Sequence, residues 1–218
     1  MFIPVGDENP REKVPFVTIG IILLNALLYF LWCSSPEALN ESVPVHALYP
    51  EQANWLSVEW WKDVFTSMYM HGNLLHILGN MIFLWIFGDN IEDKIGPVLY
   101  ILFYHLCGVI AALVQVAATT DPSIPMLGAS GAISGVLGAY VIFFPIRSVH
   151  VFVFPLGFMK TPAVVWIGWW FIQQYYLSKA ANTGVAWFAH IGGFIAGVFL
   201  ALPLRLMFYK RFKPKEAR

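Results

Sequence analysis

The sequence predicts an all-α protein that crosses a membrane several times. Of its 218 residues, 58% are hydrophobic and only 12% are charged, which is not the balance of a soluble domain. Six apolar runs have lengths near the roughly 20 residues that a helix needs to cross a bilayer. When these runs are laid out in order, the basic residues gather on one side of the membrane. These three observations predict a bundle of six transmembrane helices.

The six predicted spans are separated by polar segments of uneven length. They cover residues 14–33, 73–88, 97–118, 127–144, 161–178 and 184–207. None of them contains Lys, Arg, Asp or Glu, except for Arg205 near the end of the sixth. The second and fourth spans are short for a full crossing, which predicts local thinning of the bilayer or a partly submerged loop.

The spans divide the chain into three parts. Residues 1–13 form a polar N-terminal segment, residues 14–207 the membrane domain, and residues 208–218 a basic tail. The first span is too long for a signal-peptide core, so we expect it to be retained. With the N-terminus in the cytoplasm, every basic residue except Lys62 and Lys179 falls on the inner side. This bias predicts a multi-pass protein of the plasma membrane with both termini cytoplasmic.

Two connections between spans are unusual. The first, residues 34–72, is too long for a plain link, and its second half mixes indoles with charges around Trp60 and Trp61. Helices at a membrane interface have this composition, so we expect the segment to lie in the outer headgroup layer. The connection at residues 145–160 contains an apolar stretch, 149–158, that is too short to span. We expect this stretch at the inner surface.

Polar side chains on three spans fall at one depth near the outer boundary. Ser130 opens the fourth span, and His190 lies about six residues into the sixth, or about 9 Å along a helix. In the second span, His76 and Asn80 are four residues apart and therefore share a helical face. Because polar groups inside a membrane are costly, they are usually functional there.

Small residues predict which spans pack together. In the fourth span they lie at four-residue spacing, as they do in the sixth, and such stripes mark close helix contacts in lipid. The residues are Gly131, Ser134, Gly135 and Gly138, and Ala189, Gly193 and Gly197. If the two stripes pack on each other, Ser130 and His190 lie at one end of the same contact.

These residues suit hydrolysis by a serine nucleophile. The glycines Gly128 and Gly131 leave the Ser130 hydroxyl uncovered, and the first N–H groups of the helix face any oxyanion formed beside it. His190 is the candidate general base. The candidate oxyanion donors are His76, the Asn80 amide and the Ser130 N–H. No carboxylate lies in the last three spans, and Asp121 in the preceding loop is expected to be solvated, so the sequence offers a Ser/His dyad.

Other interpretations of the polar residues stay open. His76 and Asn80 suit an interhelical hydrogen-bonding pair, and His71, His76 and His190 suit a metal site or a proton path. The chain lacks an acidic ligand or a cysteine at ligand spacing, so we expect no metal and no cofactor. Gln173 and Gln174 are assigned to packing or an inner hydrogen bond. The net charge of zero argues against nucleic acid as a partner.

The three motifs together resemble the rhomboid family of intramembrane serine proteases. The segment at 128–131 is similar to the family's nucleophile motif, residues 189–193 to its base-bearing helix, and residues 76–80 to its oxyanion motif. His71, in the segment 70–72, extends the likeness. The resemblance implies six helices, no cofactor, and cleavage of transmembrane protein substrates near the outer boundary. It also implies that residues 34–72 lie on the membrane and that the fifth span, with residues 179–183, forms a mobile substrate entrance.

Two positions depart from the family pattern. Some members carry an aromatic residue one turn after the serine, which stacks on the catalytic imidazole, whereas this chain has Ser134 there. The family's tryptophan–arginine pair in the long loop is replaced by Trp61 and Lys62. Neither position touches the candidate nucleophile, base or oxyanion donors. The sequence therefore predicts a serine endopeptidase acting within the membrane lipid, the alternative being an inactive protein of this fold that binds client transmembrane helices.

Overall fold

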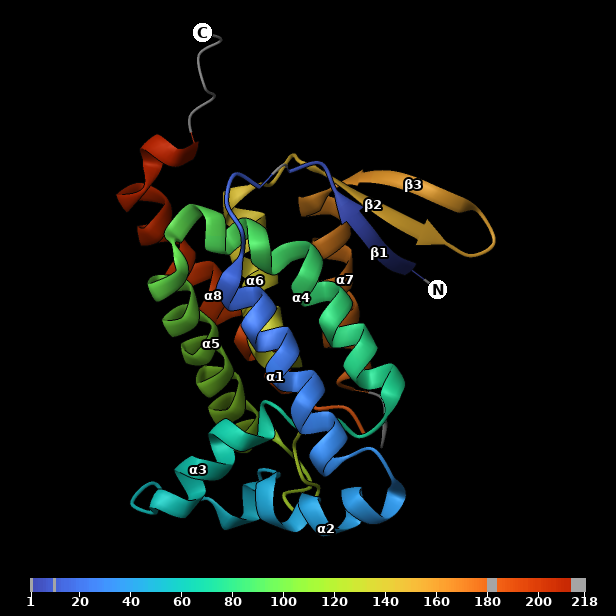
Figure 1. Ribbon diagram of the computed structural model, residues 1–218, viewed down its shortest axis with the longest axis vertical. Coiled ribbons are helices and arrows are strands. Elements are labelled where there is room, and N and C mark those ends of the chain that lie inside the picture. Colours follow the sequence, from blue (N-terminus) through green and yellow to red (C-terminus); the bar gives the residue numbers. More distant parts are fainter. Residues whose placement is uncertain (1, 10, 180–183, 213–218) are drawn as a thin grey trace, which may run out of the picture.

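The computed structural model describes residues 2–9, 11–179 and 184–212 (Figure 1). Its α-helices are α1 (Phe16–Trp32), α2 (Pro36–His46), α3 (Val58–Ser67), α4 (Leu74–Ile95), α5 (Pro97–Ala118), α6 (Ser130–Phe143), α7 (Ala163–Leu177) and α8 (Trp187–Met207). The described chain also contains two short 3₁₀ helices, η1 (Pro50–Gln52) and η2 (Tyr209–Phe212). Its three strands are β1 (Phe2–Asp7), β2 (Ser148–Val153) and β3 (Gly157–Pro162).

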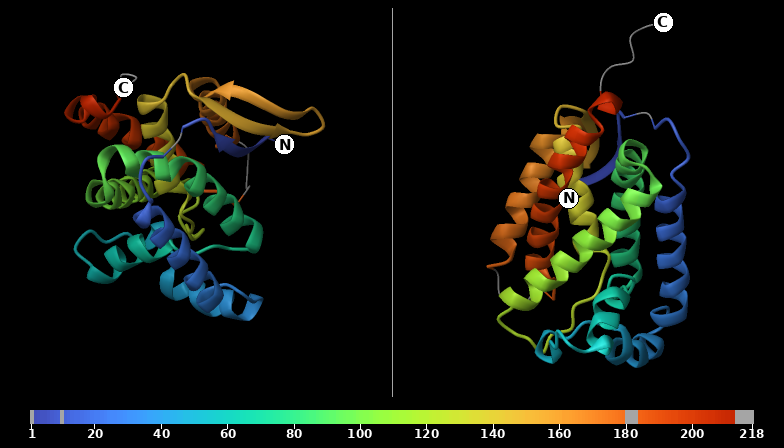
Figure 2. Two further views of the ribbon diagram at one scale, coloured as in Figure 1. Left: turned by 45° about the horizontal axis from the view of Figure 1, so that its top comes forward. Right: turned by 90° about the vertical axis from the view of Figure 1, so that its left-hand side faces the viewer.

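Helix α6 forms the centre of the bundle, with α4, α5, α7 and α8 around it and α1 on the outside against α4 (Figures 1 and 2). Most of its residues are buried, on every side of the helix. The strands and η2 lie at one end of the bundle, and α2 and α3 lie at the other (Figure 1). Helices α4, α6 and α8 all begin at the α2–α3 end.

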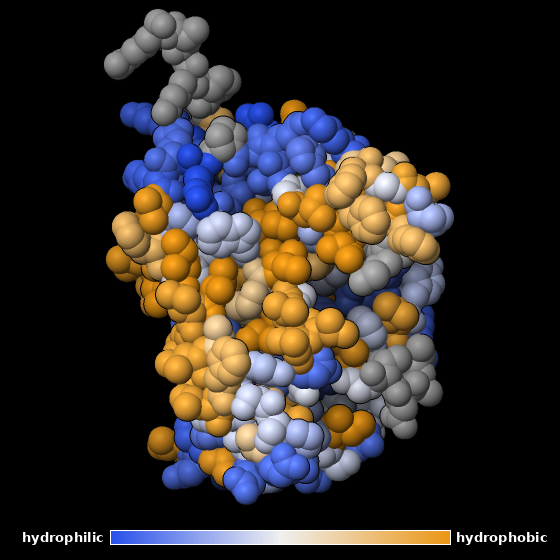
Figure 3. All heavy atoms as spheres, turned by 45° about the vertical axis from the view of Figure 1, so that its right-hand side comes forward, coloured by the Kyte–Doolittle hydropathy of each residue, from blue (hydrophilic) through white to orange (hydrophobic). Residues whose placement is uncertain are grey.

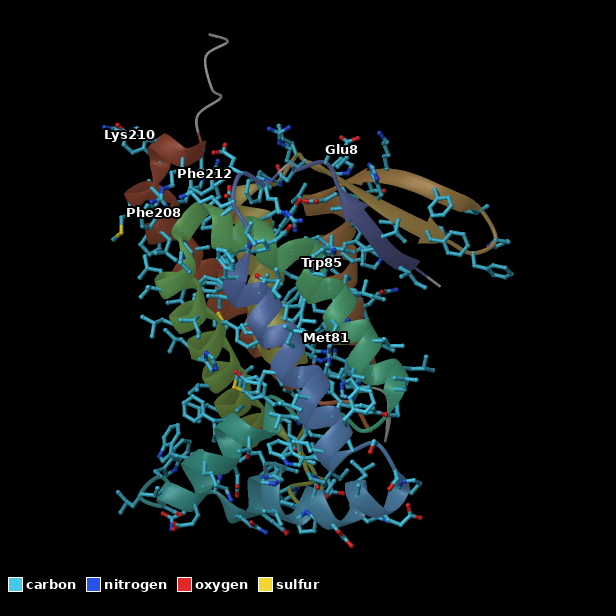
Figure 4. The ribbon with its side chains drawn as sticks, in the orientation of Figure 1. Glu8, Met81, Trp85, Phe208, Lys210 and Phe212 are labelled. Atoms are coloured by element: carbon cyan, nitrogen blue, oxygen red, sulfur yellow. The ribbon has the colours of Figure 1, made fainter. Side chains whose placement is uncertain are left out.

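On the face shown in Figure 3, the bundle carries an apolar band between two polar ends. On α4, the side chain of Trp85 is half exposed, whereas Glu8 and Lys210 lie at the end that carries the sheet (Figure 4). A surface that is apolar in the middle and polar at both ends suits a bilayer. Together with the helical content, it shows a mostly helical, multi-pass membrane protein.

Helix length supports fewer spans than the six predicted. In the described part of the chain, three helices, α4, α5 and α8, are long and apolar enough to cross a membrane, and the bent pair α1–α2 brings the number to four at most. Helices α1 and α2 meet at 112°, so α2 turns across the end of the bundle. Helix α6 is apolar but has only 14 residues.

The prediction of an all-α protein is wrong at one end of the molecule, where the three strands form an antiparallel sheet in the order β1-β2-β3. The apolar stretch predicted at 149–158 forms most of the β2–β3 hairpin, and β2 buries its alternate residues Val149, Val151 and Val153. Strand β1 pairs with β2 from about 145 residues away along the chain. Such long-range pairing leaves no local pattern in the sequence, so the sequence predicts no strand at residues 2–7.

The N-terminal segment is held against the membrane domain by side chains as well as by the sheet. The Tyr140 hydroxyl of α6 donates a 2.5 Å hydrogen bond to Asp7, and the Asn90 amide of α4 donates another at 3.0 Å. Burial raises the pKa of the Asp7 carboxyl, although these hydrogen bonds favour its charged form. Residues 2–9 are therefore packed on the 14–207 domain rather than detached from it. Part of the predicted tail, residues 213–218, lies outside the described residues.

Helix α4 runs seven residues beyond the predicted end of its span, to Ile95. The extension places Glu92, which is buried, against the N-terminus of α1. There its carboxylate accepts hydrogen bonds from the backbone N–H groups of Val17 and Thr18 and from the Thr18 hydroxyl, at 2.8–3.0 Å. A carboxylate at this position satisfies orphan N–H groups and complements the positive end of the helix dipole. Glu92 thereby joins α1 to α4.

The contact between α6 and α8 is made by glycine backbones, along the two predicted stripes. A Cβ atom on Gly193 would overlap the Gly131 carbonyl oxygen, and one on Gly197 would overlap the carbonyl of Gly135. A Cβ on Gly138 would likewise overlap the carbonyl of Phe194. The two helices therefore lie as close as their backbones allow, and no side chain fits between them.

We predict that Gly197→Ala destabilises the protein, because the added methyl group must push α8 away from the Gly135 carbonyl. Overpacking of this kind costs about 1–3 kcal/mol, which lowers Tm by several degrees. The measurement is thermal unfolding in detergent. Gly20→Ala on α1 is the matched control, because a Cβ there meets nothing within 4 Å. Equal Tm values for the two variants would contradict the glycine contact.

Candidate active site

Ser130 is the first residue of α6 and is presented by the loop before it. Gly128 in this loop has φ +123°, a conformation that favours glycine, and its N–H bonds the Ser67 carbonyl at 2.8 Å. A Cβ atom on Gly128 would lie 2.9 Å from the His76 ring. Glycine at 128 therefore allows both the turn before the serine and the approach of the His76 imidazole.

His190 reaches Ser130 from α8. Its Nε2 atom lies 2.8 Å from the Ser130 Oγ, which is hydrogen-bonding distance. The structure thus brings together the two residues that sequence analysis placed at one depth. The glycine contact between α6 and α8 begins directly below them, so the helix packing sets this distance.

Gln174 of α7 contacts the second ring nitrogen of His190, Nδ1. Its Oε1 atom lies 2.8 Å from His190 Nδ1, and its side chain is 5% exposed. The sequence predicts only packing or an inner hydrogen bond for this residue, because nothing local indicates which way α7 turns its polar side chains. The available signal was the cost of placing an amide inside an apolar span.

The departure at Ser134 has a simple structural outcome. The Ser134 hydroxyl donates a 2.6 Å hydrogen bond to the Ser130 carbonyl, one turn back in α6, and makes no stacking contact. Two tryptophans border the imidazole of His190 instead. Trp187 meets it edge to face at 5.7 Å between ring centroids, and Trp170 lies 6.2 Å away at 33°.

His76 and Asn80 lie on the first two turns of α4. The Asn73 side chain caps this helix by accepting from the His76 N–H at 2.9 Å, which fixes the helix start beside Gly128. The Asn80 side-chain nitrogen is buried and has no hydrogen-bond partner among the described residues. A buried amide donor without an acceptor is costly. Asn80 is thus available to an oxygen atom that enters the site.

These groups line one cavity of about 900 Å³ between α4, α6, α7 and α8. Ser130, His190, His76, Asn80 and Gln174 all contribute to its wall, together with the loop before α6. Its size is in the usual range for ligand sites in proteins. The cavity gives the hydroxyl, the imidazole and the amide donor access to a common space.

His71 lies directly behind the site. Its side chain is fully buried and meets the His76 ring edge to face at 5.0 Å. Burial, with a smaller contribution from the neighbouring His76, lowers the pKa of His71 to about 3, so this imidazole is neutral at physiological pH. No three His, Cys, Asp or Glu side chains within the described ranges converge as a metal site.

The fold and the site define a multi-pass helical membrane protein with a serine and a histidine facing one cavity. Comparison with known proteins is consistent with this class: the rhomboid domain family matches residues 57–206. The match covers more than half of the chain, and the protein belongs to the rhomboid family.

The relatives include bacterial proteins and eukaryotic proteins, some of them named as mitochondrial. The chain is 28% identical to rhomboid protease GluP of Bacillus subtilis over 193 residues, which are 88% of this chain and 35% of that protein. It is 29% identical to rhomboid protease GlpG of Haemophilus influenzae over 177 residues, 81% of this chain and 86% of that protein. It is 28% identical to the mitochondrial rhomboid protein 1 of Saccharomyces cerevisiae over 148 residues, 62% of this chain and 40% of that protein. The chain thus spans well under half of the Bacillus and yeast relatives.

We predict that Gly128→Ala displaces the His76 ring and lowers the reactivity of Ser130. The variant strains the backbone at φ +123° and adds a methyl group 2.9 Å from that ring. The measurement is the rate at which a fluorophosphonate labels Ser130, which we expect to fall at least tenfold.

Gly96→Ala is the control for this substitution. Gly96 also has a positive φ, +86°, but a Cβ there meets nothing within 4 Å. It reports the cost of backbone strain without the contact to His76. Equal labelling of the two variants would show that the approach of His76 to Gly128 is unimportant.

Proposed function

We propose that this protein is an intramembrane serine endopeptidase that hydrolyses peptide bonds in or near the transmembrane segments of other membrane proteins. The observation that carries the proposal is the 2.8 Å contact between Ser130 Oγ and His190 Nε2 in a cavity lined by polar groups. Two of the relatives are named rhomboid proteases, which supports the same reaction class.

In the proposed reaction, His190 removes the Ser130 proton as the hydroxyl oxygen attacks the peptide carbonyl carbon. The carbonyl oxygen becomes an oxyanion, for which Asn80, His76 and the Ser130 backbone N–H are the proposed donors. The Ser130 N–H lies in the first turn of α6 and has no acceptor within the helix. His190 then protonates the leaving amine, and an acyl-enzyme remains on Ser130. Water, activated by His190, completes the hydrolysis.

The short α6 explains how water would reach the serine. At 1.5 Å per residue, its 14 residues extend about 21 Å, whereas the 22 residues of α5 extend about 33 Å. A short helix enclosed by longer ones places its first residue below the surface of the bundle. In this proposal, the cavity above Ser130 opens at the α2–α3 end of the bundle. Water would enter there and would not have to cross the middle of the bilayer.

We further propose that α1, α4, α5, α6, α7 and α8 all cross the membrane, the short α6 being shielded from lipid by its neighbours. In this arrangement α2 and α3 lie along the outer face, and both termini are on the cytoplasmic side of a plasma membrane. The distribution of basic residues supports this orientation. Peptide-bond hydrolysis by these residues requires no cofactor.

The proposed substrates are membrane-spanning helices that unwind locally, because an intact helix hides its carbonyls in its own hydrogen bonds. Helix α7 is the proposed entrance. Its aromatic residues differ in exposure: Trp166 is buried and stacks on Phe87 of α4, whereas Trp169 is 52% exposed. The other part of the predicted entrance, residues 180–183, lies outside the described residues. Opening of α7 would then separate Trp166 from Phe87.

The first test is activity-based labelling of the purified protein in detergent. We expect a fluorophosphonate to label the wild type, and both Ser130→Ala and His190→Ala to abolish the labelling and the cleavage of a model transmembrane substrate. Ser123→Ala, in the exposed loop before the site, is the control and should behave as the wild type. Absence of labelling and cleavage in the wild type would favour an inactive protein of this fold that binds client helices.

We also predict that Asn80→Ala lowers kcat by about 10²- to 10³-fold, the usual effect of removing an oxyanion donor. KM should change little, because the oxyanion forms only during the reaction. Asn25→Ala is a control on α1, where the Asn25 side-chain NH₂ group donates to the Ile21 carbonyl in its own helix. Steady-state cleavage of the model substrate measures both constants. An unchanged kcat for Asn80→Ala would remove this residue from the proposed reaction.

A further inference from the structure

Gln174 makes two hydrogen bonds that between them determine the protonation pattern beside Ser130. We propose that Gln174 is a positioning residue that holds the His190 ring in the orientation and tautomer required of a general base. The inference rests on the proposed function, which it deepens by identifying a third side chain behind the serine and histidine.

The orientation of the Gln174 amide follows from its neighbours. Its Nε2 atom lies 3.2 Å from the Trp170 carbonyl oxygen, which can only accept a hydrogen bond. The NH₂ group therefore belongs on that side, and the Oε1 atom faces His190 Nδ1 at 2.8 Å. An amide oxygen can only accept, so the imidazole carries its hydrogen on Nδ1. The other ring nitrogen, Nε2, is left with a free lone pair toward the Ser130 hydroxyl.

This is the tautomer in which histidine can take a proton from serine. With the hydrogen on Nε2 instead, the imidazole would have no lone pair to offer Ser130. An amide in place of the usual carboxylate can stabilise that wrong tautomer if its NH₂ group faces the ring. The Trp170 carbonyl prevents this, because turning the Gln174 amide over would set two acceptors against each other.

A neutral partner suits this depth in the membrane. A buried carboxylate beside His190 would stabilise the imidazolium but would also cost free energy whenever the histidine is neutral. The amide oxygen carries no net charge at rest. When His190 takes the Ser130 proton, the bond from Nδ1–H to Oε1 becomes charge-assisted and therefore stronger. Gln174 thus stabilises the charged histidine during the reaction without leaving a buried charge before it.

No other described contact fixes the ring in the same way. Ser134 is turned back onto the Ser130 carbonyl, and neither Trp170 nor Trp187 stacks in parallel on the imidazole. The two tryptophan rings, at 33° and 89° to the imidazole, limit its movement. They do not favour a proton on one ring nitrogen over the other. The Gln174 bond distinguishes them, since it ends on Nδ1.

Kinetics provide the first test. Gln174→Met keeps the length of the side chain and removes both hydrogen bonds, so we expect kcat to fall about 10- to 100-fold with KM nearly unchanged, as for loss of a hydrogen bond to a charged group. Gln174→Glu should recover much of the loss, because a protonated carboxyl group can donate to the Trp170 carbonyl and accept from Nδ1. Gln173→Met is the matched control on the same helix. Equal kcat values for Gln174→Met and Gln173→Met would overturn the inference.

The tautomer itself provides the second test and does not depend on catalysis. Nitrogen NMR of ¹⁵N-histidine-labelled protein distinguishes a protonated Nδ1 from a protonated Nε2, and the His190 signals are those lost in His190→Ala. In Ser130→Ala, we expect a protonated Nδ1 in the presence of Gln174, and Nε2 protonation to appear when Gln174→Met is added. An unchanged tautomer overturns the inference even if the protein is an active protease. A shifted tautomer in a protein that cleaves nothing leaves Gln174 as a positioning residue and rejects the proposed function.

Discussion

The backbone contact between α6 and α8 is the constraint on which the site depends. In lipid, helices gain little from hiding apolar surface, so their association requires close packing. Here the carbonyls of Gly131 and Gly135 occupy the space that side chains at 193 and 197 would need. Ser130 adjoins the first of these glycines, and His190 lies three residues before Gly193. The alignment that fits the glycines together therefore also sets the distance between the hydroxyl and the imidazole.

The two ends of the bundle differ in the kind of polar side chain that they bury. At the α2–α3 end, the candidate site is built from groups that carry no permanent charge: a hydroxyl, imidazoles and the two amides of Asn80 and Gln174. At the sheet end, the carboxylates of Asp7 and Glu92 are surrounded by donors from neighbouring helices. Each arrangement follows from the cost of removing charge from water. Neutral groups can share a low-dielectric cavity, whereas a buried carboxylate needs several hydrogen bonds to remain there.

Helix α7 differs from the other helices around α6 because it carries Gln174 and is also the proposed entrance. Its contacts with the bundle are largely aromatic: Phe171 stacks on Phe194 at 4.4 Å, and Trp166 packs on Phe87. Helix α7 begins directly after β3, so the sheet that β3 forms with β2 and β1 adjoins the first turn of this helix. A displacement of α7 would lengthen the bond from Gln174 to His190. If α7 is the entrance, as proposed, substrate entry and the orientation of the His190 ring would be coupled through one helix.

The sequence by itself determined the features that depend on local spacing: the helices of the bundle within a few residues, apart from the C-terminal end of α4, the stripes of small residues, and the shared location of Ser130, His190, His76 and Asn80 around one cavity. Depth and helical face are counted along the chain, so a single sequence contains them. Only the tertiary structure decided the pairing of β1 with β2, the role of Glu92 at the start of α1, and the contact of Gln174 with His190. Each of these joins segments far apart in the chain, and each depends on how a helix or strand is rotated about its own axis. No local period records that rotation, because it is set by packing against neighbours that the residues of the segment do not specify.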